Sequence, residues 1–142
     1  MDIEMIASFS VISADPGADR RLFLDSLGLP LQPPESVQGS AYLFTESVDG
    51  AKHFGVWPLS EAADACFGQD TWPDTHPVPQ ASVEFEVGSA EGVSGAAREL
   101  SERGYSLLHW PRTEPWGQVI TRLQSSSGVI VGVCYTPWFH DG

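Results

Sequence analysis

Strict alternation of apolar and polar residues marks the start of each half of the chain. Residues 5–13 read MIASFSVIS, which places Ala7 and Phe9 on one face and Ile6 and Ser8 on the other. Residues 81–87 read ASVEFEV and alternate in the same way. Because successive side chains of a β-strand point to opposite faces of a sheet, both stretches are predicted to be strands.

Each of these strands is followed by a segment with helical signals. After the first strand, Asp15 is a suitable N-cap, Pro16 suits the first helical position, and Gly28 marks the end of the segment. After the second strand, residues 89–104 carry an apolar stripe with helical spacing, and Gly104 stands where a helix-ending glycine belongs. The sequence thus predicts one helix after the first strand of each half.

The rest of the first half predicts β-structure. SAYLFTE (40–46) and KHFGVWPL (52–59) are apolar stretches on either side of Asp49-Gly50, a pair that favours a hairpin. A further strand is expected near LQPPES (31–36), where the two prolines predict that it is short and lies at a sheet edge.

The second half repeats the order of elements. Its three further strands are expected within residues 105–112, 117–124 and 128–136. The chain therefore predicts β-α-β-β-β twice, an internal repeat of about 60 residues within one domain. Module 1 spans about residues 1–68, a linker that begins after a short helix-like piece spans about 69–79, and module 2 spans about 80–142.

The composition limits the partners that the protein can have. The 19 acidic residues outnumber the 7 basic ones and give a net charge of −12, which repels nucleic-acid phosphates and anionic lipid head groups. No apolar run is long enough to span a bilayer, and the first residues lack the pattern of a secretory signal. We therefore expect a soluble, cytoplasmic protein without nucleic-acid or membrane partners, in which Cys66 and Cys134 are buried thiols.

Tryptophan is the residue type that stands out. The chain has five, and an indole ring stacks on flat or cationic ligands. Trp57, Trp116 and Trp110 are the candidates for ligand contact, with core or interface packing as the alternative for each. The motifs G-x-S-x-G, H-E-x-x-H, G-x-x-x-x-G-K-[ST] and C-x-x-C do not occur in the sequence, so covalent catalysis has no support from motifs.

Arg122 is a single basic residue in the middle of a predicted strand. A buried arginine needs an acidic partner, and Glu84 and Glu114 are the candidates. Two interpretations remain open, an ion pair between strands and a clamp for a ligand carboxylate. Tyr42 and His109 are expected to be polar groups in the wall of the site.

The repeated order of elements and the segment EPWGQVITRLQSSSGVIVGVCYTPW (114–138) resemble the vicinal-oxygen-chelate superfamily, which includes glyoxalase I, extradiol dioxygenases, fosfomycin-resistance enzymes and bleomycin-resistance proteins. The resemblance covers essentially the whole chain. It departs from the family at the turn before the last strand, which usually reads Asp-Pro-Asp/Glu-Gly and here is Ser125-Ser126-Ser127-Gly128. It implies an α+β fold of two βαβββ modules, whose curled sheets form a cup with the helices on the convex side.

Metal-dependent members of this superfamily hold one divalent ion in the cup with four His, Gln or Glu side chains, from the first and last strands of each module. The matching positions here are Ser8, Gly55, Ser82 and Gly132, and none of them supplies a good ligand. The resemblance therefore implies a site without metal or cofactor, whose hollow floor accepts an organic ligand. For Gly132, a bulge or tight twist of the strand is the alternative.

A metal site at shifted positions is a further hypothesis. His53 shares the strand face of Gly55, and Glu84 shares that of Ser82. Two ligands are too few for a zinc-type site, and the last strand offers no third donor. The same two residues would be the acid/base pair of an enzymatic alternative.

The resemblance and the composition together favour a small-molecule binding protein of the glyoxalase/bleomycin-resistance type, a homodimer that sequesters an aromatic or cationic compound. A metal-dependent lyase, isomerase or dioxygenase of the same superfamily is the alternative, and an interaction module with a cup filled by its own tryptophans is a third. No catalytic residue is assigned. The candidate ligand-binding residues are Ser8, His53, Gly55, Trp57, Ser82, Glu84, Trp110, Trp116, Arg122 and Gly132.

Overall fold

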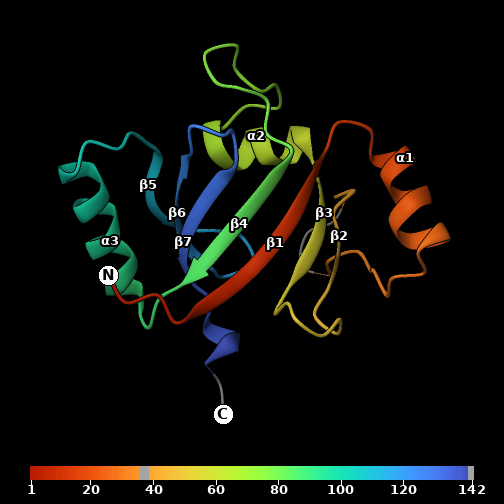
Figure 1. Ribbon diagram of the computed structural model, residues 1–142, viewed down its shortest axis with the longest axis horizontal. Coiled ribbons are helices and arrows are strands. Elements are labelled where there is room, and N and C mark those ends of the chain that lie inside the picture. Colours follow the sequence, from red (N-terminus) through yellow and green to blue (C-terminus); the bar gives the residue numbers. More distant parts are fainter. Residues whose placement is uncertain (36–38, 141–142) are drawn as a thin grey trace.

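Seven β-strands form one mixed sheet in the residues that the computed structural model describes, 1–35 and 39–140 (Figure 1). Their order across the sheet is β2-β3-β1-β4-β7-β6-β5. The strands are β1 (Met5–Ser13), β2 (Leu43–Thr45), β3 (Phe54–Pro58), β4 (Ala81–Glu86), β5 (Leu107–Thr113), β6 (Val119–Gln124) and β7 (Ile130–Tyr135). The helices are α1 (Pro16–Arg20), which continues as the π-helix η1 (Arg21–Ser26), then α2 (Leu59–Phe67), α3 (Ala90–Glu102) and the 3₁₀-helix η2 (Pro137–Phe139). The predicted α+β class is confirmed.

The sheet consists of two similar halves. β1 pairs in parallel with β3, β4 pairs in parallel with β7, and β1 pairs with β4 in the antiparallel sense. The second half is a complete βαβββ unit made of β4, α3, β5, β6 and β7, as predicted. The halves therefore meet at the β1–β4 pair in the centre of the sheet (Figure 1).

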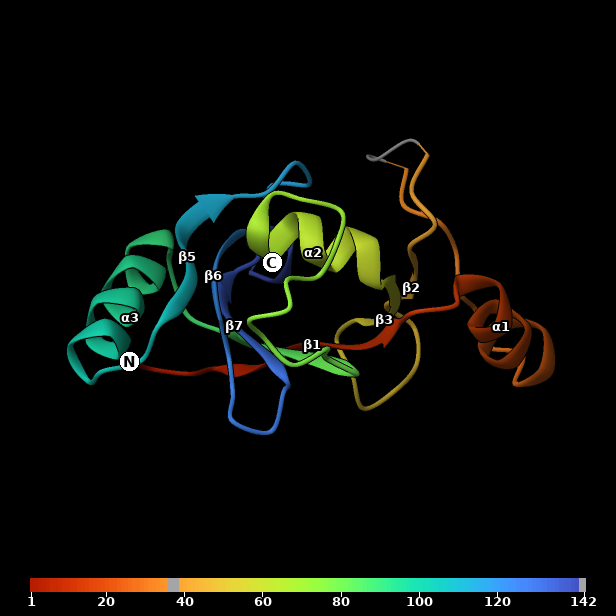
Figure 2. The ribbon, with the colours of Figure 1, turned by 90° about the horizontal axis from the view of Figure 1, so that it is seen from above.

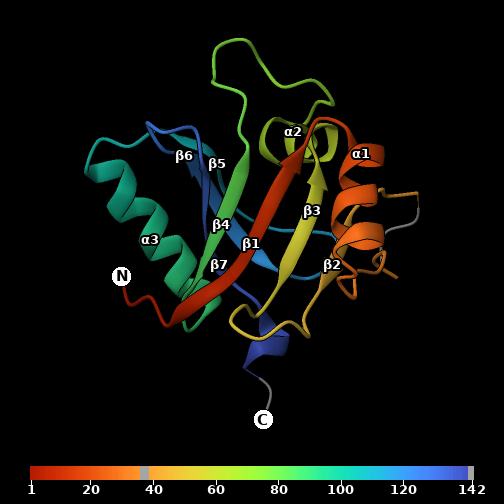
Figure 3. The same cartoon turned by 45° about the vertical axis from the view of Figure 1, so that its right-hand side comes forward.

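The sheet is curled, so that one of its faces is concave and the other convex (Figure 2). α1 and α3 lie outside the curl at its two flanks, as the resemblance implies for the helix of each module. α3 packs Val93 and Ala96 against Val133 of β7. Figure 3 shows α1 beside β3, where Phe23 of η1 contacts Phe54 with ring centroids 6.0 Å apart. Neither α1 nor α3 covers the concave face of the sheet.

α2 lies on the concave side, between the raised edges of the sheet (Figure 2). Its buried residues Ala62, Ala63 and Cys66 share a core cluster with Ile12 of β1 and Ile130 of β7. Small side chains on this face allow the helix to lie close to the sheet. The sequence predicts the helix itself but not its position, which closes one end of the concave space.

A β-bulge changes the faces at the start of β1. The pairing of β1 with β4 shifts between Ile6 and Ser8. Ile6 is consequently 57% exposed, whereas Ala7 is fully buried and faces the concave side together with Ser8. Alternation instead places Ile6 on the face of Ser8, and Ala7 on the other face. That prediction is wrong because the bulge adds one residue to the strand.

The edge strand expected near residues 31–36 is reduced to a single bridge, in which Gln32 pairs with Phe44. Pro33 and Pro34 have no N–H groups to extend it. Residue 36 lies outside the described residues. The neighbouring strand β2 is also short, since only Leu43–Thr45 of the predicted 40–46 is paired.

Trp72 stabilises the segment between the two halves, residues 69–79. Trp72 is buried, and its Nε1 donates a hydrogen bond of 2.9 Å to the carbonyl of Pro77. Cys66 and Cys134 are unpaired and buried, as predicted. In residues 1–35 and 39–140, no helix has the length and apolar character needed to cross a membrane.

Candidate functional site

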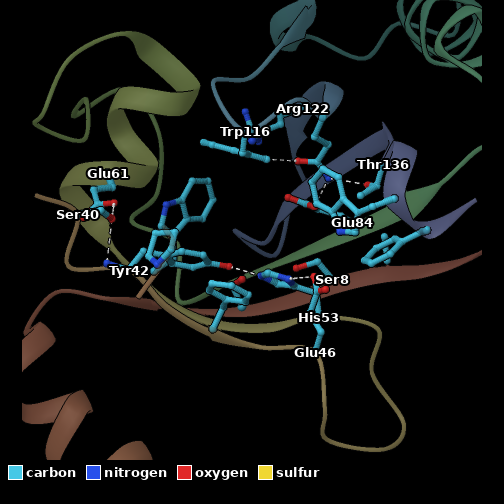
Figure 4. Close-up of a pocket in the computed structure, with 18 residues that line it drawn as sticks. Ser8, Ser40, Tyr42, Glu46, His53, Glu61, Glu84, Trp116, Arg122 and Thr136 are labelled. Atoms are coloured by element: carbon cyan, nitrogen blue, oxygen red, sulfur yellow. Dashed lines mark hydrogen bonds and ion pairs between the residues drawn. The ribbon is translucent and has the colours of Figure 1, made fainter. Parts of the chain in front are cut away.

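A cavity of about 290 Å³ lies on the concave side of the sheet. Residues of β1, β2, β3, β4, β6, α2 and η2 line it (Figure 4). Most of the predicted ligand-binding residues are among them, namely Ser8, His53, Trp57, Glu84, Trp116 and Arg122. Gly55, Ser82, Trp110 and Gly132 are not part of the lining.

Gly55 makes room for Tyr42. A Cβ atom on Gly55 would lie 2.7 Å from Cε2 and 2.8 Å from Cζ of the Tyr42 ring, closer than real contacts allow. β2 and β3 pair so that Phe44 is opposite Gly55, and Tyr42 reaches diagonally across the glycine. The ring thus covers the floor position that the sequence suggested would be hollow.

Gly132 likewise lies beneath neighbouring side chains. Its Cβ would lie 2.9 Å from Cδ1 of Ile120 and 3.2 Å from Cγ of Glu84. The glycine therefore leaves room for the side chains of Ile120 and Glu84, and Glu84 lines the cavity. Ser82 is buried, and it lies on the same face of β4 as Glu84, two residues earlier in the strand.

Trp116 and Trp110, two of the candidate ligand contacts, differ in their position relative to the cavity. Trp116 lines the cavity and donates a hydrogen bond of 3.0 Å from Nε1 to Oε1 of Gln118. Trp110 lies on β5 and is 57% exposed, outside the cavity. The proposed ligand contact therefore has a geometric basis for Trp116 and none for Trp110.

Glu84 has one protein partner among the described residues, the amide of Gln118. Nε2 of Gln118 donates to Oε1 of Glu84 over 2.9 Å and to Oγ1 of Thr136 over 3.1 Å. Together with the Trp116 contact, these bonds fix the position of Gln118. The second oxygen of the Glu84 carboxylate remains available to a ligand.

Arg122 is fully buried and forms an ion pair with Glu114 of the β5–β6 loop, one of its two predicted acidic partners. Its Nη1 lies 3.4 Å from Oε1 of Glu114 and 3.1 Å from Nε2 of His109. Its guanidinium carbon lies 5.6 Å from the centre of the Trp57 ring, a cation–π contact. Burial lowers the pKa of His109 to about 4, so its imidazole is neutral and accepts a hydrogen bond from Arg122. Nη2 of Arg122 is buried and has no hydrogen-bond partner among the described residues, so a clamp for a ligand carboxylate stays open beside the ion pair.

A hydrogen-bonded chain in the first half was not predicted. The hydroxyl of Tyr42 lies 2.5 Å from Nε2 of His53, whose Nδ1 lies 2.8 Å from Oε2 of Glu46. Burial is the main cause that raises the pKa of Tyr42, and the carboxylate of Glu84 adds to it. The alternation of Tyr42, Phe44 and Glu46 on one strand face was the available signal, but it does not reveal which partner residues they meet.

Further lining residues escaped the sequence analysis. Glu61 of α2 accepts hydrogen bonds from Oγ of Ser40 and from the backbone N–H of Ala41. Trp138 and Phe139 of η2 close another side of the cavity. The periodicity of the sequence does not predict where α2 and η2 lie relative to the sheet, so it could not place these residues at the cavity.

The four positions that hold a divalent ion in metal-dependent relatives do not fit such an ion here. Ser8 and Ser82 offer hydroxyl groups, which bind divalent metals weakly, and Gly55 and Gly132 offer no side chain. Tyr42 occupies the space over Gly55, and Ile120 and Glu84 occupy the space over Gly132. Within residues 1–35 and 39–140, no cluster of three or more His, Cys, Asp or Glu side chains has the geometry of a metal site.

No model of a protein family matches the sequence, and no protein of curated function matches it as a relative. Solved structures do match. A glyoxalase/bleomycin resistance protein/dioxygenase superfamily member from Vibrio splendidus is 11% identical with a TM-score of 0.56, over 93% of this chain and 98% of that one. A hypothetical protein from Bacillus halodurans is 16% identical with a TM-score of 0.58, over 93% and 94% of the two chains.

An enzyme is also among the similar structures. A variant of methylmalonyl-CoA epimerase from Streptomyces coelicolor, in complex with 2-nitronate-propionyl-CoA, is 16% identical with a TM-score of 0.58, over 99% of this chain and 100% of that chain. At such identities the likeness concerns the arrangement of the backbone. The chain accordingly has the fold of the vicinal-oxygen-chelate superfamily, as its sequence predicts.

Proposed function

We propose that the protein binds a small organic molecule in this cavity without a metal ion, and that the molecule combines a flat aromatic ring with a positively charged group. The volume of about 290 Å³ is at the lower end of the range of small-molecule sites. It suits a compound of one or two rings.

Aromatic side chains support the first part of this proposal. Three of the five tryptophans line the cavity, together with Phe44 and Phe139; they are Trp57, Trp116 and Trp138. Aromatic faces offer both apolar contact and attraction for a cation. Trp116 and Trp138 are partly exposed, so a ligand would reduce their contact with water.

The carboxylate of Glu84 is the observation that carries the second part. It lies in the cavity lining with the amide of Gln118 as its partner among the described residues. The other lining carboxylates, Glu46 and Glu61, have their own hydrogen-bond donors, and Nη1 of Arg122 is paired with Glu114, whereas its Nη2 has no hydrogen-bond partner among the described residues. A cationic group beside Glu84 would therefore gain a charge-assisted hydrogen bond.

Matched probes test the proposal by isothermal titration calorimetry. 1-Naphthylmethylammonium, 1-naphthylmethanol and 1-naphthylacetate share a ring system and differ in charge. We expect the cation to bind more tightly than the alcohol by about tenfold or more, and the anion to bind least. Equal affinity for the three compounds, or none for any, would contradict the proposal.

A pair of variants locates the effect. Glu84→Gln should remove the preference for the cation and leave the affinity for the alcohol unchanged. Glu91→Gln makes the same chemical change at an exposed position of α3 and should keep the preference.

The enzymatic alternative is a metal-dependent lyase, isomerase or dioxygenase. The similarity of the fold to an epimerase structure is the observation that favours it. Elemental analysis after incubation with Ni²⁺, Mn²⁺, Fe²⁺ or Zn²⁺ and dialysis separates the two. Stoichiometric metal that is lost in a His53→Ala variant would support the alternative.

A further inference from the structure

Tyr42, His53 and Glu46 form a continuous hydrogen-bonded chain along one wall of the cavity (Figure 4). We propose that this chain is a proton relay, which makes the Tyr42 hydroxyl an acid–base and nucleophilic group toward a molecule bound in the cavity. In this proposal Tyr42 is the catalytic residue, and His53 and Glu46 position and supply its proton. The inference goes beyond ligand binding and does not require that the ligand be a cation.

The partners determine where the protons lie. A carboxylate accepts hydrogen bonds and does not donate them, so Nδ1 of neutral His53 carries the proton that faces Glu46. Nε2 is then the acceptor for the Tyr42 hydroxyl. This is the arrangement in which an imidazole removes a proton from a hydroxyl while a carboxylate holds the ring.

The reverse state delivers a proton. When His53 is protonated, its Nε2–H donates to the Tyr42 oxygen, and the hydroxyl proton of Tyr42 is free to turn toward a ligand. Transfer of that proton breaks the Tyr42 O–H bond, and the Nε2 proton of His53 replaces it. The positive charge on the imidazole is lost as the ligand gains the proton, so the relay is balanced in both directions.

Packing holds the relay in place before any ligand arrives. The His53 ring stacks on Phe44 with centroids 4.9 Å apart and planes 5° apart. The Tyr42 ring lies over Gly55, where any larger residue would displace it. A catalytic group whose rotamer is fixed by its surroundings is already in its working position.

The surroundings also explain why Tyr42 needs a base. Burial first, and then the negative charge of Glu84, raise the pKa of Tyr42. The hydroxyl therefore keeps its proton at neutral pH unless an acceptor takes it directly. His53, at 2.5 Å, is that acceptor.

Benzenesulfonyl fluoride measures this activation chemically. When the Tyr42 oxygen attacks the reagent, an S–O bond forms, the S–F bond breaks, fluoride leaves, and the hydroxyl proton passes to His53. Tyr42, Tyr105 and Tyr135 are the three tyrosines of the chain and fall in different tryptic peptides, so mass spectrometry gives a labelling rate for each. We expect Tyr42 to react faster than Tyr105, which is exposed, by about tenfold or more.

Conservative variants separate the relay from packing. His53→Gln keeps a hydrogen-bond acceptor for Tyr42 but has no basic group, and Glu46→Gln removes the carboxylate. Both should lower the rate at Tyr42 to that of Tyr105 while the melting temperature stays close to that of the wild type. Tyr135→Phe is the control, because Tyr135 stacks on His140 at 4.8 Å outside the cavity, and it should leave the rate at Tyr42 unchanged.

The outcomes distinguish this inference from the proposed function. Labelling of Tyr42 at the rate of Tyr105, or at the same rate in the wild type and in His53→Gln, overturns the relay even if 1-naphthylmethylammonium binds. Fast, His53-dependent labelling without binding of that cation refutes the cationic ligand and supports the relay.

Discussion

Two glycines show how a single missing side chain shapes the cavity. The resemblance to the superfamily implies that Gly55 and Gly132 lie on strand faces that point toward the cup. Each glycine instead makes room for a neighbouring side chain, Tyr42 over Gly55 and Glu84 over Gly132. The empty positions thus bring two polar groups over the floor of the site.

Alanine at position 55 should disturb both the fold and the site. Its Cβ would lie within 2.8 Å of two ring atoms of Tyr42, so Tyr42 has to move away from His53. We expect Gly55→Ala to lower the free energy of unfolding by about 1–3 kcal/mol, measured with urea. Gly95→Ala, in the middle of α3 with nothing within 4 Å of its Cβ, should raise it by about 0.5–1 kcal/mol. Equal effects of the two substitutions would contradict this account.

His109 should make stability depend on pH. Burial lowers its pKa from about 6.5 in the unfolded chain to about 4 in the folded protein. The unfolded state therefore takes up a proton first as the pH falls from 6.5 toward 4, and the folded state loses stability over this range. Because His109 is partly exposed, we expect a loss of about 1–2 kcal/mol.

The contribution of His109 is isolated by comparison with His109→Gln, which keeps an acceptor for Arg122 but does not titrate. Urea unfolding at pH 7 and at pH 4.5 gives the pH dependence of each protein. The wild type should lose more stability than the variant. Parallel losses would show that His109 is not responsible.

At the scale of elements, the sequence predicts best those helices and strands whose ends carry capping or turn residues. Asp15 accepts a hydrogen bond from the N–H of Ala18, so α1 begins at the predicted capping residue. Ser89 caps α3 in the same way through the N–H of Gly92. The π-helical turn η1 was not predicted, because its hydrogen bonds, such as Leu27 N–H to the Leu22 carbonyl, have no distinct residue pattern.

The candidate site was only partly predictable for a related reason. Alternation places His53 and Trp57 on the face of Gly55 and Glu84 on that of Ser82, and the resemblance implies that these faces point into the cup; all three residues line the cavity. Contacts between elements depend on register and on the placement of helices. The pairing of Phe44 with Gly55, which brings Tyr42 and Glu46 to His53, is fixed by the whole loop between β2 and β3 rather than by any residue in it.

Glu86 should be the anchor of the C-terminal element. It is fully buried, accepts a hydrogen bond of 2.5 Å from the N–H of Thr136, and lies 2.8 Å from Nε2 of His140. These contacts bracket η2. We expect Glu86→Ala to lower the free energy of unfolding by about 2–4 kcal/mol, because it leaves buried donors without a partner. Glu99→Ala, which removes surface ion pairs with Arg103 and with the N-terminal ammonium of Met1, should change it by about 1 kcal/mol or less; a similar small effect at Glu86 would contradict the anchoring role.

At the scale of the molecule, apolar residues on the outer face remain uncovered. α1 and α3 occupy the flanks of the sheet (Figure 2), and Ile6 and Phe9 of β1 are 57% and 43% exposed between them. The resemblance to the superfamily implies a homodimer. We propose this part of the outer face as its interface.

Light scattering after gel filtration tests the dimer. We expect twice the chain mass of 15.4 kDa for the wild type and the mass of one chain for Phe9→Lys. Leu27→Lys, at another exposed apolar residue, is the control and should remain dimeric. Because each chain carries a charge of −12, salt at about 0.5 M should favour association by screening repulsion. A monomeric wild type at every salt concentration would contradict the proposal.

The division of the cavity between the two halves has a consequence for dissected forms of the protein. Tyr42, His53 and Trp57 precede the segment 69–79, whereas Glu84 and Gln118 follow it. If the chain is cut within that segment, each fragment carries one wall of the cavity, and a ligand that touches both walls lowers the concentration at which the fragments associate. If the proposed ligand binds, we expect the two fragments to act as a complementation sensor, in which their association reports the presence of the small molecule.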